Sequence, residues 1–103
     1  MYRRIEVLVG GDWRGPVSAL RYLGNEASPR WRFNLFCHMG CDGPPEEIKK
    51  SGNVRFAWTD EGWETYGRHV YKSCVADSGL PVRVVGLHGD LVFKDRDQVA
   101  IAV

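Results

Sequence analysis

The sequence contains only three cysteines and no long apolar run. An odd number of cysteines cannot be paired completely within one chain, so we expect a reducing compartment. No apolar run approaches the roughly 20 residues of a membrane-spanning helix. The basic amino-terminal segment does not continue as a signal peptide, because Glu6 interrupts its short apolar run. These features predict a soluble, cytoplasmic protein that does not enter a membrane.

Sequences typical of cofactor and metal chemistry are also scarce. Gly10 and Gly11 are not followed by the Lys and Ser or Thr of a phosphate-binding loop. Asp90, Asp95 and Asp97 do not have the spacing of a calcium loop, and turn formation explains them better. No paired catalytic acid and base is evident. We therefore expect no cofactor and assign no catalytic residue.

The net charge is small, so composition does not indicate a polyanionic partner. The 103 residues carry 14 basic and 13 acidic side chains, for a net charge of +1. Residues 1–33 are more basic and residues 34–66 more acidic, but the difference is slight.

Glycine and aromatic residues, by contrast, are abundant. The chain has 12 glycines, together with 4 Phe, 4 Trp and 4 Tyr. This composition indicates many turns and bulky packing, as in a β-rich fold. A length of 103 residues suits one domain and not two, so residues 1–103 are treated as a single domain.

The stretch from residue 30 to residue 45 organises the predicted fold. Trp31, Phe33 and Leu35 alternate with polar residues, which predicts a strand over residues 30–38 with the rings and Cys37 turned inward. Glycines and two prolines then end the strand and lead into a helix.

Similar patterns predict further strands along the chain. They cover residues 3–9, 17–23, 54–59, 82–87, 91–93 and 99–103. Short connections favour an antiparallel meander, and Gly89-Asp90 indicates a hairpin between a buried strand at 82–87 and the strand at 91–93. The apolar final strand is expected in a sheet or in a contact between copies of the chain.

Two helices are predicted between the strands. A short one covers residues 45–50 and ends with Gly52 in the left-handed conformation. A longer one covers residues 60–77 and starts at a Thr59 or Asp60 cap. Its stripe facing the sheet consists of Trp63, Tyr66, Val70 and Cys74.

The longer helix has an alternative, because it contains two glycines. Gly62 and Gly67 each cost about 1 kcal/mol of helix propensity. A hairpin with strands at 62–66 and 68–73 would avoid that cost. With the helix, the predicted fold class is α+β: a mainly antiparallel sheet of five to seven short strands, with one short and one longer helix packed on a face.

For function, the sequence favours a small non-enzymatic protein that binds a protein partner, as inhibitors, antitoxins and immunity proteins do. Trp, Tyr and Arg are frequent for a short chain, and these types anchor interfaces. Trp13, Arg14 and Trp63 are the predicted anchors, because they lie in turns or at the start of an element.

A nucleic-acid-binding module is the first alternative. Arg30, Arg32 and Arg55 stand beside aromatic residues, and such pairs can contact phosphates and stack on bases. Against this, a period of two puts the rings and the arginines on opposite faces of a strand.

A metal- or thiol-dependent enzyme is the second alternative. Cys37, His38 and Cys41 lie close together, and Cys37 or Cys41 could serve as a ligand or a nucleophile. Additional ligands or a base would come from Cys74, His69 and His88. No second close pair of ligands is present, so cysteines that are simply packed remain the simpler interpretation.

Overall fold

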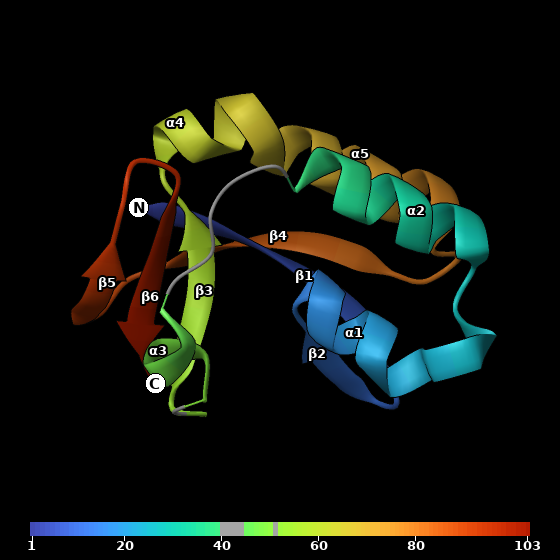
Figure 1. Ribbon diagram of the computed structural model, residues 1–103, viewed down its shortest axis with the longest axis horizontal. Coiled ribbons are helices and arrows are strands. Elements are labelled where there is room, and N and C mark those ends of the chain that lie inside the picture. Colours follow the sequence, from blue (N-terminus) through green and yellow to red (C-terminus); the bar gives the residue numbers. More distant parts are fainter. Residues whose placement is uncertain (40–44, 51) are drawn as a thin grey trace.

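The computed structural model describes residues 1–39, 45–50 and 52–103. Predictions that fall on residues 40–44, which include Cys41, and on Ser51 lie outside the described residues. Within them, six strands form one sheet in which every pairing is antiparallel, and helices pack against it (Figure 1). The predicted α+β class is therefore confirmed.

The sheet is built around its first strand. The strands are β1 (Tyr2–Val9), β2 (Asp12–Arg14), β3 (Val54–Trp58), β4 (Val82–Leu87), β5 (Leu91–Lys94) and β6 (Gln98–Ala102). Their order is β2-β1-β3-β6-β5, with β4 paired to β1 as well. Gly10 and Gly11 both have positive φ, which permits the tight turn between β1 and β2.

Apolar residues pack on both faces of the sheet. On one face, Ile5, Val7 and Val9 of β1 are buried against the helices. On the other face, Ala57, Val99 and Ile101 form a second, smaller cluster. Alternate residues of a strand point to opposite faces, so neighbouring positions such as Ala57 and Trp58 join different clusters.

Two predicted strands are wrong, because residues 17–23 and 30–38 are helical. They correspond to α1 (Pro16–Leu23) and α2 (Pro29–His38), joined through the short 3-10 turn η1 (Gly24–Glu26). Both helices have proline in the first turn. In α2 the Ser28 hydroxyl also accepts a hydrogen bond from the Trp31 N–H at 3.2 Å. These capping signals outweigh the alternating pattern.

The predicted orientation of the residues in 30–38 is wrong for the same reason. Trp31 is fully buried, as expected, but Phe33 is 70% exposed and Cys37 is exposed. In a helix, residues 31 and 35 share a face while residue 33 lies on the other side.

The predicted meander is also wrong, and so is the predicted hairpin between the strands at 82–87 and 91–93. The connections around α1 and α2 are helical, and β4 pairs with β1 rather than with β5. The strand at 82–87 is less buried than predicted, since Val84 is 37% exposed.

Other predictions are confirmed. The short helix is α3 (Glu46–Lys50), and Gly52 has a φ of 71°. The final strand is β6, which pairs with β3 on one edge and β5 on the other, so a second copy cannot extend the sheet by pairing with it. No helix in the described part of the chain is long and apolar enough to span a membrane.

The long helix at 60–77 is confirmed, and the hairpin alternative is wrong. It consists of α4 (Asp60–Gly62), a π-helical turn η2 (Trp63–Gly67) and α5 (Arg68–Asp77). The Thr59 hydroxyl caps it by accepting from the Gly62 N–H at 3.0 Å. The predicted stripe faces the core, with Val70 and Cys74 buried.

The two helix glycines are explained by close packing. A Cβ on Gly62 would lie 1.9 Å from the Asp97 carbonyl oxygen, in the turn that leads into β6. A Cβ on Gly67 would lie 2.8 Å from the Trp63 ring and 3.0 Å from the Trp58 ring. Side chains at these positions would push the helix off the sheet.

We predict that Gly62→Ala destabilises the protein by about 2 kcal/mol or more, although alanine is the better helix former. The cause is the contact with the rigid backbone of Asp97. Urea denaturation of both proteins measures the change in the free energy of unfolding. Thr65→Ala, at an exposed site of the same helix, is the control and should be close to neutral. A Gly62→Ala variant as stable as the wild type would contradict the close packing.

Candidate functional site

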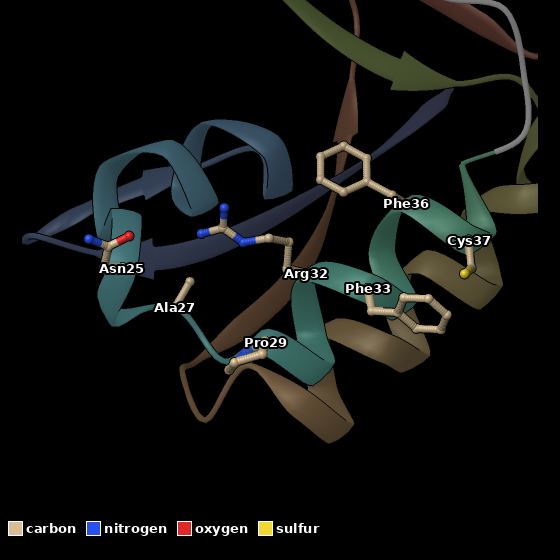
Figure 2. A pocket seen from close by; sticks show the side chains of 7 residues that line it. All are labelled: Asn25, Ala27, Pro29, Arg32, Phe33, Phe36 and Cys37. Carbon is tan, nitrogen blue, oxygen red and sulfur yellow. The ribbon is translucent and has the colours of Figure 1, made fainter.

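In the described part of the chain, an open concave surface lies along α2. A groove of about 640 Å³ is lined by residues of η1, the segment that follows it, and α2 (Figure 2). A second hollow of about 210 Å³ continues toward α1 and shares Arg32 and Phe36 with the first. We call the two together the α1–α2 groove. Its remaining walls are Val17, Leu20, Arg21, Gly24, Asn25, Ala27, Pro29, Phe33 and Cys37.

Two phenylalanines make the surface of this groove strongly apolar. Phe33 is 70% exposed and Phe36 is 56% exposed. Figure 2 shows both rings projecting away from the axis of α2. They stand outward because Trp31 and Leu35, on the opposite side of the helix, are fully buried in the core. Large exposed rings beside a hollow are typical of binding surfaces.

Arg32 supplies the positive charge at the middle of the groove. Its Nη2 atom donates a hydrogen bond to the Gly24 carbonyl oxygen at 2.6 Å, which holds the guanidinium between η1 and α2. Its other N–H groups have no carboxylate acceptor among the described residues. The groove therefore combines apolar rings with a positioned cation.

The predicted anchors Trp13, Arg14 and Trp63 lie elsewhere and are not brought together. Trp13 and Arg14 belong to β2, whereas Trp63 starts η2, which follows α4 and is well separated from β2 (Figure 1). All three are partly buried and engaged within the chain. The Arg14 guanidinium lies 4.7 Å from the centre of the Tyr22 ring, and Trp63 packs beneath the guanidinium of Arg3.

The Trp13 ring packs against one arginine of an ionic network that is centred on the buried Glu6. The Arg83 guanidinium lies 4.1 Å from the centre of the Trp13 ring and pairs with Glu6 at 2.7 Å. Glu6 also accepts from Arg4 at 3.0 Å. Burial by itself would raise the pKa of Glu6, but hydrogen bonds from Arg83 and Arg4 and their charges lower that pKa below its ordinary value of 4.5.

The arginines of the nucleic-acid alternative do not form one surface. Arg30 pairs with Asp77 at 3.4 Å, and Arg32 lies in the groove. Arg55 is exposed on β3, in a different part of the fold (Figure 1). Of these three arginines, only Arg32 lines the groove with the exposed rings of Phe33 and Phe36.

The residues of the metal and thiol alternative are also separated. Cys37 is exposed on α2, whereas Cys74 is fully buried on α5. The ring of His38 stacks on that of His69 with centres 5.7 Å apart. The pKa of His69 is lowered, first by desolvation and then by the charges of Arg68, His38 and Lys72. Cys41 lies outside the described residues, and within them no group of three or more His, Cys, Asp or Glu could hold a metal ion.

Burial dominates the chemistry of Cys74. It raises the pKa of the thiol to about 11. The Trp31 indole nitrogen, in the same core cluster, has no hydrogen-bond partner among the described residues. Cys74 is therefore a packing residue rather than a nucleophile.

Sequence reasoning missed Arg21, Phe33 and Phe36 as site residues. The signal for the last two was present in Ser28-Pro29, which marks a helix start, and in the spacing of four between Trp31 and Leu35. No comparable signal distinguished Arg21. Comparison with protein-family models, curated proteins and solved structures finds no match to this chain.

We predict that a thiol reagent modifies Cys37 rapidly in the native protein and Cys74 only after unfolding. With its pKa raised from 9.0 to about 11, Cys74 holds about a hundredfold less thiolate near neutral pH, and burial also blocks access. Mass spectrometry of peptides at successive labelling times measures both rates, with urea-unfolded protein as the control. Equal native rates would contradict the buried placement of Cys74.

We predict that Glu6→Gln destabilises the protein by about 1.5–3 kcal/mol near neutral pH, because it removes the charged acceptor of the hydrogen bonds from Arg4 and Arg83. The lowered pKa makes this contribution fully present above pH 4.5, and it is lost as the pH falls through the folded-state pKa. The wild-type and variant unfolding free energies should therefore converge in acid. Glu47→Gln, at an exposed site, should cost little at any pH, and a Glu6→Gln effect that is independent of pH would refute the ionic network.

Proposed function

We propose that the protein is a non-enzymatic interaction module that binds a protein partner through the α1–α2 groove. The observation that carries the proposal is the exposure of Phe33 and Phe36 on one helix, beside a hollow. Exposed rings of this size lose contact with water when a partner covers them, which provides binding free energy.

The form of the groove favours a protein over a small molecule. A pocket for a small ligand buries most of that ligand, whereas here the two rings themselves remain largely in solvent. A broad partner surface can cover both rings at once. This mode of binding suits a small inhibitor, antitoxin or immunity-type protein, the class favoured by the composition of the chain.

A reducing location such as the cytoplasm fits the same proposal. Cys37 is a free, exposed thiol in the wall of the groove. Such a thiol stays available for packing against a partner only where it is not driven into disulfides.

The test compares protein capture by variants that differ in the groove. Wild-type protein, the Phe33→Ser/Phe36→Ser double variant and a Val92→Ser control are immobilised and exposed to nuclease-treated extract of the native cells. Val92 is 47% exposed on β5, away from the groove (Figure 1). Quantitative mass spectrometry then measures the captured proteins, and circular dichroism verifies that each variant is folded.

We expect at least one protein that wild type and the control capture equally, and that the double variant captures about tenfold less. Replacing two exposed rings costs little folding stability, so the loss would reflect binding. A capture profile that is the same for wild type and the double variant would overturn the proposal.

A further inference from the structure

Most arginines of this chain are neutralised by neighbouring carboxylates. Seven of the ten form ion pairs within the described residues. The three without a carboxylate partner there are Arg21, Arg32 and Arg55. Two of these, Arg21 and Arg32, line the α1–α2 groove. Unneutralised guanidinium groups are therefore concentrated at the proposed site.

Carboxylates are correspondingly scarce around the groove. Glu26 is the only acidic residue between positions 15 and 39, and it is not among the residues that line either hollow. The hydrogen bond from Arg32 to the Gly24 carbonyl oxygen restrains the side chain, so it loses less conformational entropy when it binds an anion. Its remaining N–H groups present a planar set of donors that suits a carboxylate.

We propose that the occupant of the α1–α2 groove is an acidic amphipathic segment of a partner protein. This inference rests on the proposed function and specifies its partner. Apolar side chains of the segment cover Phe33 and Phe36, and its carboxylates pair with Arg21 and Arg32. Part of the groove lies between α1 and α2. Amphipathic segments commonly bind in such grooves by inserting their apolar face.

Charge argues against the other occupants. A second copy that docks groove to groove would bring Arg21 and Arg32 against arginines or apolar groups, because the groove offers no carboxylate to receive them. A nucleic acid draws its affinity from many cations, whereas this groove has two and the chain has a net charge of only +1. An acidic and apolar segment complements both properties of the surface.

The test selects short random peptides, displayed on phage, for binding to the wild-type protein. We expect enriched sequences with a net negative charge and at least one Trp, Phe or Leu. Synthetic copies are then titrated by fluorescence anisotropy against wild type and charge variants. Enrichment of neutral or basic sequences, or of none, would overturn the acidic partner.

The charge variants are Arg21→Glu, Arg21→Glu/Arg32→Glu and Arg55→Glu. We expect the double variant to lose about tenfold or more in affinity and Arg21→Glu to lose part of that. Arg55→Glu is the matched control, since Arg55 is also unpaired but lies on β3, and it should bind as wild type does. Arg21→Glu remains informative if the double variant fails to fold, because Arg21 is exposed and makes no ion pair among the described residues. Equal affinity of wild type and both groove variants would refute the proposal.

Two further measurements separate the rival occupants and the two proposals. The first measurement is binding of oligodeoxythymidylate; tight binding that the groove variants abolish would overturn the acidic segment. The second is sedimentation; wild-type dimers that the Phe33→Ser/Phe36→Ser variant dissociates would also overturn it. The capture from extract is also repeated with the Arg21→Glu/Arg32→Glu variant. If capture of a protein is lost in Phe33→Ser/Phe36→Ser but not in Arg21→Glu/Arg32→Glu, the protein-binding function is supported and the acidic partner is refuted. If no captured protein depends on the two phenylalanines, both proposals fall.

Discussion

The burial of Trp31 sets the geometry on which the candidate site depends. Trp31 and Leu35 lie four residues apart, and both are buried in the core cluster that also holds residues of α5 and β1, so the rotation of α2 about its axis is fixed. Successive residues advance by 100° around a helix, which turns Phe33 and Phe36 to the outer side. The exposed rings are therefore a consequence of core packing, and nothing in the fold can turn them inward without removing Trp31 from the core.

Elements whose local sequence signals agree with their tertiary packing could be predicted from the sequence. The long helix from Asp60 to Asp77 has a Thr59 cap, acidic residues in its first turn and an apolar stripe of period 3.6. The strand β3 alternates cleanly and lies between two other strands. Even the two glycines that weakened the helix prediction have a physical reason, since Asp97 and Trp58 leave no room for a side chain.

The candidate site could not be predicted, because it depended on one misread element. Apolar residues at 31, 33 and 35 satisfy a strand of period two, but residues 31 and 35 satisfy a helix equally well. The choice is made by the Ser28 cap and by the cover that α5 provides, and the latter is a tertiary effect. A strand over residues 30–38 places Phe33 in the core, so it predicts no groove along this segment. The pairing of β4 with β1 was likewise decided over a long sequence distance.

The position of β6 has a consequence for synthesis on the ribosome. β3 is complete at Trp58, but its partner β6 begins only at Gln98. The nascent chain must therefore carry an unpaired strand edge, and the apolar side of Ala57, until residues near Ile101 emerge. Such edges invite pairing with other chains, so this half of the sheet is the part that a chaperone would most need to shield.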